Sequence, residues 1–337
     1  MIFVDIRYKL KKMPTLTANF IPSLPFKNAH FNTMYRPLFM KDTINYKRKR
    51  ITTWDKDFID LDFSVVGSKT LVLQIHGLEG SSQSSYIITT ANHLNNVGFD
   101  TVSMNLRSCS GEDNLLLETY HSGKTDDVDF IIKHLTTNYN YENIIMVGFS
   151  LGGNLTLKYL GEYDDIPSEV KGGIAISVPI DLTTSQAELL KLKNKIYLNE
   201  FIKSIKLKML EKAEKFPDFK LNKKLLFQAT KFRHLEKQYT VPVFGFKSSE
   251  DYWEKASSKP YISNIKVPSL LINSLDDSFL SKECYPFKEA KNSSNFHLLT
   301  PKYGGHVGFI GSFKEEESRW IEKNITRFIQ ENIGIKS

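Results

Sequence analysis

Two hydrophobic periods alternate along the chain from residue 69 to residue 181. Short apolar runs predict buried strands, whereas longer stretches with an apolar residue every three or four positions predict helices. This alternation is typical of a mostly parallel sheet with helices on both faces, so the predicted fold class is α/β. The predicted strands cover residues 70–77, 101–106, 144–150 and 171–179, and the predicted helices cover 84–98, 124–139 and 151–163.

The pattern changes after residue 181. Residues 182–262 have a helical pattern, are rich in lysine, and show no strand signal until VPVFGF at 241–246. Two further strands, at 269–275 and 296–301, and a last helix over 312–333 follow this insertion. We therefore predict a single α/β domain with a helical cap, divided into an arm at 1–50, core segments at 51–182 and 263–337, and the cap at 183–262.

The N-terminal fifth of the chain has a different pattern. Residues 14–50 are polar and spaced by prolines, which predicts an arm without regular structure laid over the domain. Lys47–Arg50 resembles a nucleic-acid patch, but it leads directly into a strand pattern at 51–66, which favours an exposed strand edge. In that strand Asp60 and Asp62 alternate with apolar residues, as in a half-buried antiparallel strand. Residues 1–13 are apolar and then basic, the reverse of a secretory signal, so we interpret them as a tail with Met13 as an alternative start.

Gly148-Phe149-Ser150-Leu151-Gly152 joins a predicted strand to a predicted helix. This is the G-x-S-x-G pattern of a nucleophile elbow in the strand–turn–helix context that the elbow requires. The turn forces the serine into strained dihedral angles, and a Cβ at either glycine would collide with the packed backbone. Ser150 is therefore the candidate nucleophile, placed at a helix N-terminus with free N–H groups.

A serine nucleophile needs a base and an acid that orients the base. On this fold the acid and the histidine follow the serine in that order, on loops after later strands. His306 lies in a glycine-rich loop after the strand at 296–301, and Asp276 and Asp277 follow the strand at 269–275. Counted from the end of the strand, Asp277 is the preferred acid, and Asp276 is expected to shape the turn.

An oxyanion hole requires two backbone N–H donors. One is expected from Leu151, the residue after the nucleophile, and the other from Leu78 in the loop that follows the strand at 70–77. His76 in the same region is interpreted as structural, because the site already has a base. The loop around Arg107 and Cys109 is expected to border the pocket, with Arg107 holding the loop and Cys109 packed.

Composition and charge further limit the class of protein, its compartment and its partners. The 337 residues are 41% hydrophobic and 25% charged, which is ordinary for a globular protein, and no apolar run is long enough to span a membrane. Two distant cysteines predict neither a disulfide framework nor a metal site, and favour the cytoplasm. No zinc-finger, RNP or arginine-rich motif accompanies the net charge of +7, so nucleic acid is not an expected partner.

Much of the positive charge lies in the predicted cap, at 186–232. The preferred interpretation is a solvated helical face. The alternative is a basic lid that makes peripheral contact with anionic head groups of a membrane, or with acidic acyl substrates. A weaker pattern, His121 followed by Asp126, is associated with acyl transfer but arises easily by chance.

Several motifs together resemble the YheT-like branch of the α/β hydrolases, which is related to the mammalian ABHD1/ABHD3-type proteins. The motifs are HGLEGSSQSSY at 76–86, NLRSCSGE at 105–112, YHSG at 120–123, GFSLGGN at 148–154, LINSLDD at 271–277 and GGHVGF at 304–309. The resemblance covers about residues 20–330 and implies an α/β-hydrolase fold with Ser150, Asp277 and His306 at the triad positions. It also implies an esterase, lipase or phospholipase. Ser108 and Ser278 depart from the family's usual glycine and proline.

Three functions remain open at this point. The leading hypothesis is a serine carboxylic-ester hydrolase that acts on small or lipid-like acyl esters through an acyl-enzyme and needs no cofactor. The first alternative is an acyltransferase, in which an alcohol instead of water takes the acyl group. The second is a catalytically silent binding protein, which an intact set of Ser, Asp and His disfavours.

Overall fold

The computed structural model describes residues 15, 16 and 18–336. The interpretation of residues 1–13 as a tail therefore lies outside the described residues. Within the described part of the chain, none of the helices combines the length and the apolarity that crossing a membrane would require.

In the described part of the chain, a nine-stranded sheet forms the centre, in the order β1-β9-β8-β7-β6-β4-β5-β3-β2. All neighbouring strands are parallel except at one edge, where β2 pairs with β3 and β3 with β5 in antiparallel fashion. The predicted mostly parallel α/β fold is thus confirmed. The strands are β1 (Thr15–Leu16), β2 (Lys47–Thr52), β3 (Phe58–Ser64), β4 (Thr70–Ile75), β5 (Asp100–Met104), β6 (Asn143–Phe149), β7 (Val170–Ile176), β8 (Ser269–Ile272) and β9 (Phe296–Leu299).

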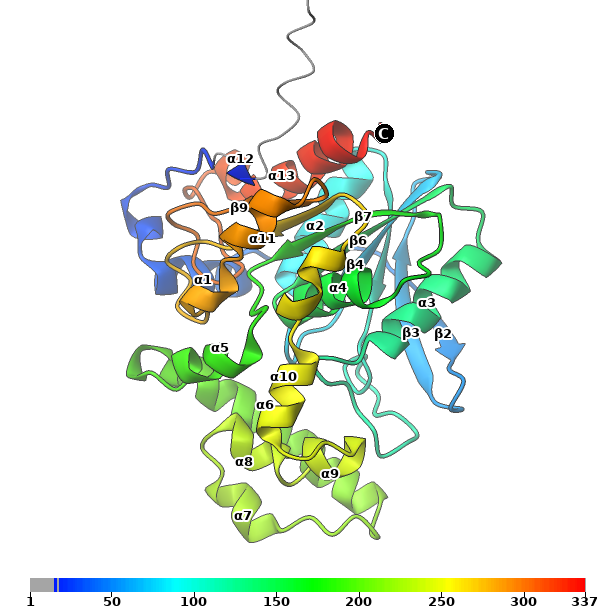
Figure 1. Ribbon diagram of the computed structural model, residues 1–337, viewed down its shortest axis with the longest axis vertical. Coiled ribbons are helices and arrows are strands. Elements are labelled where there is room, and N and C mark those ends of the chain that lie inside the picture. Colours follow the sequence, from blue (N-terminus) through cyan, green and yellow to red (C-terminus); the bar gives the residue numbers. More distant parts are fainter. Residues whose placement is uncertain (1–14, 17, 337) are drawn as a thin grey trace, which may run out of the picture.

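Helices cover both faces of the sheet, and each face has its own apolar core. Alternate residues of a strand point to opposite faces, so Leu71 and Leu73 of β4 join one cluster and Val72 joins the other. The first cluster is closed by α3 and α4, and the second by α2 and α13 (Figure 1). The helices of the core are α1 (Ala29–Phe39), α2 (Ser85–Asn96), α3 (Thr125–Asn138), α4 (Leu151–Glu162), α11 (Phe287–Asn292), α12 (Glu315–Ser318) and α13 (Trp320–Phe328), and the π-helical turn η6 (Ile329–Ile333) continues α13.

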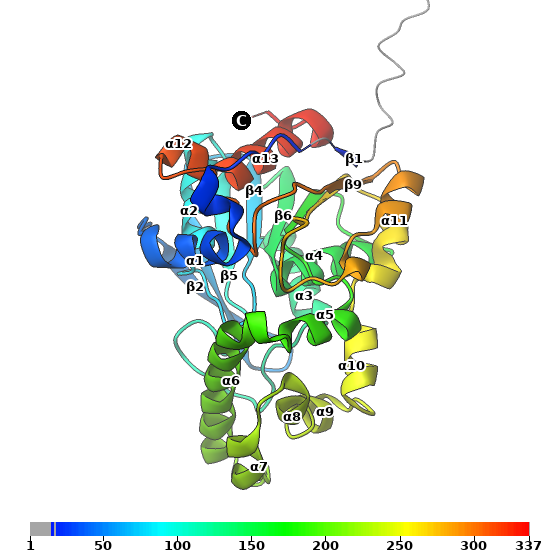
Figure 2. The same ribbon diagram turned by 90° about the vertical axis from the view of Figure 1, so that its left-hand side faces the viewer.

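Between β7 and β8 the chain leaves the sheet and forms a group of helices at one end of the molecule. Figures 1 and 2 both show this cap beyond one end of the strands. The predicted strand signal VPVFGF is wrong, because residues 240–244 form α9 and Gly245 ends it in the left-handed region (φ 69°). A strand there would have no partner to pair with. The cap helices are α5 (Leu182–Leu189), α6 (Lys195–Lys215), α7 (Lys223–Gln228), α8 (Phe232–Glu236), α9 (Thr240–Phe244) and α10 (Ser249–Ala256).

The prediction that the N-terminal arm has no regular structure is wrong, because the arm contains the helix α1. The Asn28 side chain accepts a hydrogen bond from the Phe31 N–H and caps α1, and Pro37 lies in the last turn, near the point where the helix ends. Asn32 and Arg36 are buried against the core and bonded to its backbone. Polar residues that reach distant partners thus hold this helix in place, and its pattern of apolar residues alone did not reveal it.

The strand β3 is buried on both faces, not half-buried as predicted. On the exposed edge strand β2, Arg48 pairs with Asp62 and Arg50 pairs with Asp60. In each pair two guanidinium nitrogens donate to the two carboxylate oxygens, all at 2.8 Å. These ion pairs allow the polar face of β3 to be covered, because a buried carboxylate needs a charged or hydrogen-bonding partner. The prediction that Lys47–Arg50 forms an exposed strand edge is confirmed.

Candidate active site

Ser150 stands at the turn between β6 and α4, with φ 52° and ψ −117°. This strained conformation is possible because neither Gly148 nor Gly152 carries a side chain. A Cβ on Gly148 would overlap the Gly152 carbonyl oxygen, and a Cβ on Gly152 would overlap the carbonyl oxygen of Ile75. The turn therefore has the geometry expected of a nucleophile elbow.

The structure brings Ser150, His306 and Asp277 into one hydrogen-bonded chain. His306 Nε2 lies 2.9 Å from Ser150 Oγ, and His306 Nδ1 lies 2.8 Å from Asp277 Oδ2. The Asp277 side chain is fully buried, and its other oxygen accepts a hydrogen bond from the Phe279 N–H at 2.9 Å. A carboxylate beside Nδ1 keeps the proton there, which leaves Nε2 free to accept the serine hydroxyl.

Asp276 points to the backbone and not to the imidazole. Its Oδ1 accepts a hydrogen bond from the Gly305 N–H at 2.9 Å, so it ties the turn after β8 to the loop that carries His306. Burial raises the pKa of Asp276. The geometry thus places Asp277 in the position expected for the acid and Asp276 in the turn, as the sequence analysis preferred.

The expected oxyanion loop passes directly beside the serine. A Cβ on Gly77 would lie 3.1 Å from Ser150 Cβ, and both Leu78 and Leu151 line the cavity at the serine. His76 is structural: its Nε2 accepts from the Leu106 N–H at 3.1 Å, its Nδ1 lies 2.8 Å from the Gly77 carbonyl oxygen, and burial lowers its pKa to about 4. These bonds fix the start of the loop before Leu78.

Glu79, the next residue of this loop, connects the core to the cap, and the sequence analysis did not single it out. Its carboxylate accepts a hydrogen bond from Tyr120 Oη at 2.6 Å and pairs with Lys208 of α6 at 3.1 Å. Ser204, also on α6, donates to the second oxygen. Glu79 itself has φ 55°, so side-chain bonds hold a strained backbone beside the Leu78 N–H.

The loop that carries His306 rests on α1. The Thr33 hydroxyl oxygen accepts the His306 N–H at 2.8 Å, and Asn32 exchanges hydrogen bonds with the Ile310 backbone at 2.9 and 3.0 Å. A Cβ on Gly305 would overlap the Ala29 carbonyl oxygen, which explains why glycine is needed there. The arm is thus part of the frame of the site, a role that no local signal in its sequence revealed.

Phe279 is a second site residue that the sequence did not identify. Its ring stacks on the His306 imidazole with centroids 4.2 Å apart. The preceding Ser278 exchanges hydrogen bonds with the Asn194 side chain at the start of α6, at 2.6 and 2.7 Å. Ser278, which stands where the family usually has proline, therefore links the turn that carries Asp277 to the cap.

The other features of the sequence analysis have structural roles. Arg107 is fully buried and binds Asp55, Asp57 and Asp127, which agrees with the prediction that it holds its loop. Ser108 has φ 59°, in the region that favours the family's usual glycine. The free cysteines, Cys109 and Cys284, are buried.

His121 and Asp126 are not paired with each other. His121 Nδ1 accepts a hydrogen bond from the Gly123 N–H, burial lowers its pKa to about 3, and Asp126 pairs with Lys124.

The interpretation of the cap lysines as a solvated face is wrong for part of α6. Lys212 is almost fully buried and pairs with Asp113 at 2.9 Å, and Lys208 pairs with Glu79. Lysine chains can bury their methylene stems while their charged ends reach polar partners. Lys191, Lys193 and Lys195 are exposed, as expected.

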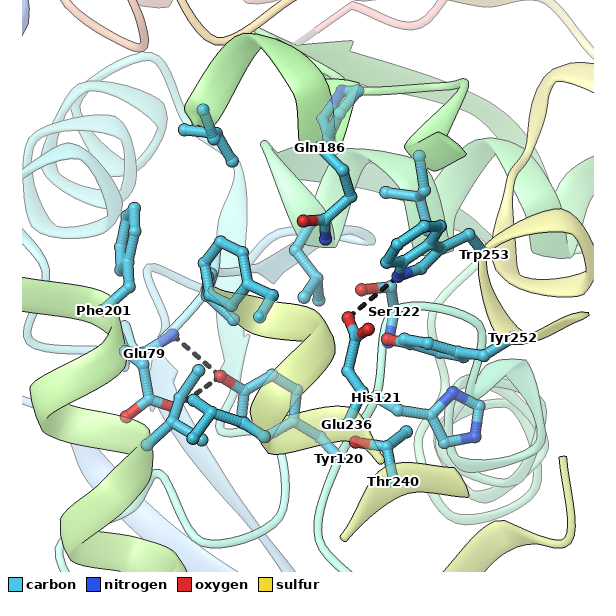
Figure 3. A pocket seen from close by; sticks show the side chains of 18 of the residues that line it. Glu79, Tyr120, His121, Ser122, Gln186, Phe201, Glu236, Thr240, Tyr252 and Trp253 are labelled. Atoms are coloured by element: carbon cyan, nitrogen blue, oxygen red, sulfur yellow. Dashed lines mark hydrogen bonds between the residues drawn. The ribbon is translucent and has the colours of Figure 1, made fainter. Parts of the chain in front are cut away.

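A cavity of about 160 Å³ extends between Ser150 and the cap. Leu78, Leu151, Phe279 and His306 line it beside the serine. Its polar or aromatic members toward the cap include Glu236, Gln186, Thr240 and Trp253 (Figure 3), and Ser185, Lys208, Tyr239 and Tyr252 also line it. The remaining wall is mostly apolar and includes Leu182, Leu189, Phe201, Ile205, Met209, Phe232 and Leu235.

Burial raises the pKa of Glu236 to about 7. The pKa of Glu236 in the folded protein exceeds its ordinary value of 4.5. Below about pH 4.5 the carboxyl therefore costs the folded protein no stability, and the unfolding free energy falls as the pH rises toward 7. The difference in unfolding free energy between the Glu236→Gln variant and the wild type should therefore grow by up to about 3 kcal/mol, in favour of the variant, from pH 4.5 to pH 8. Urea denaturation at both pH values measures this. The exposed Glu254→Gln variant is the control, and an equal difference at both pH values would contradict the prediction.

Comparison with known proteins identifies the class. Residues 70–312 match the family model described as the alpha/beta hydrolase fold. The chain belongs to this family. More narrowly, it is 30% identical over 330 residues to the "Putative esterase YheT" of Escherichia coli (strain K12), covering 95% of this chain and 96% of that protein. The chain thus belongs to the YheT-like branch, which confirms the resemblance.

Other relatives carry related names. The human "Phospholipase ABHD3" is 25% identical, covering 96% of this chain and 81% of that one. The "Monoacylglycerol lipase" of Saccharomyces cerevisiae is 28% identical, covering 78% of this chain and 59% of that protein. Among solved structures, the Pyrococcus furiosus esterase Pf2001 superimposes with a TM-score of 0.57 at 20% identity, covering 85% of this chain and 90% of that one, which supports the fold. The predicted enzyme class, a carboxylic ester hydrolase, is confirmed by these relatives.

Proposed function

We propose that the protein is a serine esterase that works through an acyl-enzyme. The observation that carries the proposal is the hydrogen-bonded chain from Ser150 through His306 to Asp277, at the mouth of an apolar cavity. Ser150 Oγ attacks the ester carbonyl while His306 Nε2 takes its proton and then passes it to the leaving alcohol. Water, deprotonated by His306, attacks the acyl-enzyme and releases the acid, and Ser150 recovers its proton.

Charge that develops during the reaction is stabilised at two places. Asp277 stabilises the imidazolium that forms on His306, and the Leu78 and Leu151 N–H groups hold the oxyanion. Within the described residues, neither N–H donates a hydrogen bond to another protein group, which leaves both donors available.

We propose lipid-like acyl esters as substrates and the cytoplasm as the location. The mostly apolar wall of the cavity suits an acyl chain, and the names of relatives include a phospholipase and a monoacylglycerol lipase. Two free cysteines favour a reducing compartment.

The test of the proposed function is hydrolysis of p-nitrophenyl esters from acetate to palmitate, together with labelling by a fluorophosphonate. We expect turnover that peaks at one chain length, and a label on the peptide that carries Ser150. Ser150→Ala is the control, since it has no hydroxyl to label. A chain that neither turns over an ester nor accepts the label would be the silent binding protein of the second alternative.

Acyl transfer is distinguished from hydrolysis by the acceptor. Analysis of the products in the presence of a series of added alcohols would show the acid if water is the acceptor and a new ester if an alcohol is. Hydrolysis predicts that the acid remains the main product at millimolar alcohol. A new ester as the main product would assign the protein as an acyltransferase.

Peripheral contact with a membrane is a further part of the proposal. Leu192, three residues before α6, and Ile196, in its first turn, are 84% and 71% exposed and lie among the exposed Lys191, Lys193 and Lys195. Apolar side chains surrounded by lysines suit an anionic lipid surface. We expect sedimentation with phosphatidylglycerol vesicles and weaker sedimentation with phosphatidylcholine vesicles. Equal recovery in the supernatant with both would contradict the contact.

The Glu79 contacts predict a change in kcat. Glu79→Gln removes the charge that pairs with Lys208 and weakens the support of the Leu78 N–H, so kcat should fall about tenfold with a smaller change in KM. Steady-state kinetics on the best p-nitrophenyl ester measures both constants. Glu142→Gln, which removes an exposed pair with Lys69, is the matched control. A rise in KM at constant kcat would assign Glu79 to binding instead.

A further inference from the structure

Glu236 is a carboxyl group placed in the wall of a mostly apolar cavity. It ends α8 of the cap and is 92% buried, with only 8% of its surface exposed. The side chain of Trp253 on α10 donates a hydrogen bond to Oε1 at 2.9 Å. The other oxygen, Oε2, is buried and has no hydrogen-bond partner among the described residues. A buried polar atom without a partner is costly, so its retention calls for an explanation.

No cation of the described residues forms an ion pair with Glu236. Arg233, one turn earlier on α8, pairs with Glu250 and lies over the Trp253 ring. Ser249 on α10 acts on Glu236 as a weak hydrogen-bond donor, which lowers the pKa of the carboxyl, but burial outweighs it, and the Ser249 hydroxyl is itself buried without a full hydrogen bond. The described part of the protein therefore offers Oε2 only this weak donor and no cation.

Gln186 of α5 points toward the same space from the opposite side. Figure 3 shows its amide and the Glu236 carboxyl directed into the cavity, with the Trp253 and Tyr252 rings beside them. An amide offers both donors and an acceptor. The two side chains, on different helices of the cap, thus form a polar spot in a mostly apolar wall, in addition to the Glu79–Lys208 pair that also lines the cavity.

We propose that Glu236 and Gln186 form a subsite that binds a hydroxyl group of the substrate, so that the enzyme prefers esters carrying a hydroxyl away from the scissile bond. The inference rests on the proposed function, since it treats the cavity as the substrate site. A hydroxyl fits because it can donate to Oε2 and accept from the Gln186 amide. A primary ammonium can only donate, and it would bind well only to the ionised carboxylate.

The pKa of Glu236 supports this choice of ligand. Because burial raises it to about 7, both protonation states are present near neutral pH. A hydroxyl can bond to either state, as donor to the carboxylate or as acceptor from the acid. Sites built to bond a substrate hydroxyl discriminate against analogues that lack it, since the buried polar groups then stay unpaired.

The experiment compares esters that differ by one hydroxyl. One arm uses p-nitrophenyl hexanoate, octanoate and decanoate beside their ω-hydroxy counterparts, and the other uses butyl octanoate beside the monooctanoate of 1,4-butanediol. We expect the hydroxyl to raise kcat/KM about tenfold in one arm, which shows whether the hydroxyl belongs to the acyl group or to the alcohol. A hydroxyl that lowers kcat/KM in every pair, or leaves it unchanged, would overturn the subsite.

Variants test whether Glu236 is responsible. Glu236→Leu should abolish the preference for the hydroxyl, and Glu236→Gln, which keeps an acceptor for Trp253, should retain most of it. Glu254→Gln, on the exposed side of α10, should leave it unchanged. In Glu254→Gln the rate of Ser150 labelling by a small ethyl fluorophosphonate should equal that of the wild type. Cooperative urea unfolding of all three variants shows that their fold is intact. A preference that survives in Glu236→Leu would also overturn the subsite.

Binding separates this inference from the proposed function. Calorimetry on the Ser150→Ala chain with the matched amides, octanoyl and 8-hydroxyoctanoyl N-methylamide, requires no turnover. About tenfold tighter binding of the hydroxylated amide, lost when Glu236→Leu is added, would support the subsite even if no ester is hydrolysed. Equal affinities would exclude a hydroxyl on the acyl group. If N-butyl octanamide and N-(4-hydroxybutyl) octanamide, which vary the alcohol side, also bind equally, the subsite is overturned even if ester hydrolysis is established.

Discussion

The Asp277→Asn variant is expected to hydrolyse esters about 10⁴-fold more slowly than the wild type, with KM little changed. Asn is isosteric, but its NH₂ group donates to Nδ1 and holds the imidazole in the tautomer with the proton on Nε2. That nitrogen lies 2.9 Å from Ser150 Oγ and can then no longer accept the serine proton. The variant also lacks the negative charge of Asp277, which stabilises the imidazolium that forms on His306. The measurement is kcat on the best p-nitrophenyl ester.

Asp276→Asn is the matched control, one residue away in the same turn. Its amide oxygen can still accept the Gly305 N–H, and the substitution removes a buried carboxyl whose second oxygen has no partner. We expect kcat to stay within about tenfold of the wild type, because this side chain supports the loop and not the imidazole itself. The reverse result, with Asp276→Asn inactive and Asp277→Asn active, would assign Asp276 as the acid.

The central sheet could be predicted from sequence because its strands are local apolar runs with helices between them. Each strand from β4 to β9 falls in a run that is buried on both faces, so short-range periodicity is sufficient. The position of the site follows from the same order, since Ser150, Asp277 and His306 all come after parallel strands, whose carboxyl ends meet at one edge. The glycine pattern predicted the strained turn at Ser150, because a side chain on Gly148 or Gly152 would overlap the backbone.

The frame around the site could not be predicted in this way. Thr33 and Asn32 hold a loop about 270 residues further along the chain, and such a contact leaves no periodic signal. Asp60 and Asp62 alternate as exposed residues would. Their burial depends on partners from other elements, the arginines of β2 and, for Asp62, Asn105. Glu236 is one acidic residue among many in a charged cap, and only the fold shows that it faces the cavity.

The Arg36→Met variant is expected to lose about 3–5 kcal/mol of unfolding free energy. Arg36 and Glu322 are 1% and 0% exposed, and Arg36 Nη1 lies 2.7 Å from Glu322 Oε1. Methionine fills much of the space but leaves the Glu322 carboxylate buried without a cation. It also frees the Gly308 carbonyl oxygen, which now accepts from Arg36 at 3.3 and 3.4 Å. Because Gly308 lies two residues after His306, the folded variant should also have a lower kcat.

A double-mutant cycle in urea separates the charge from the packing. Glu322→Gln in the Arg36→Met background should restore part of the lost stability, because the buried residue no longer carries an unpaired charge. It should restore little of kcat, since the Gly308 carbonyl oxygen still lacks the guanidinium that holds the His306 loop. An Arg36→Met chain as stable and as active as the wild type would mean that Thr33 and Asn32 hold this loop without the ion pair.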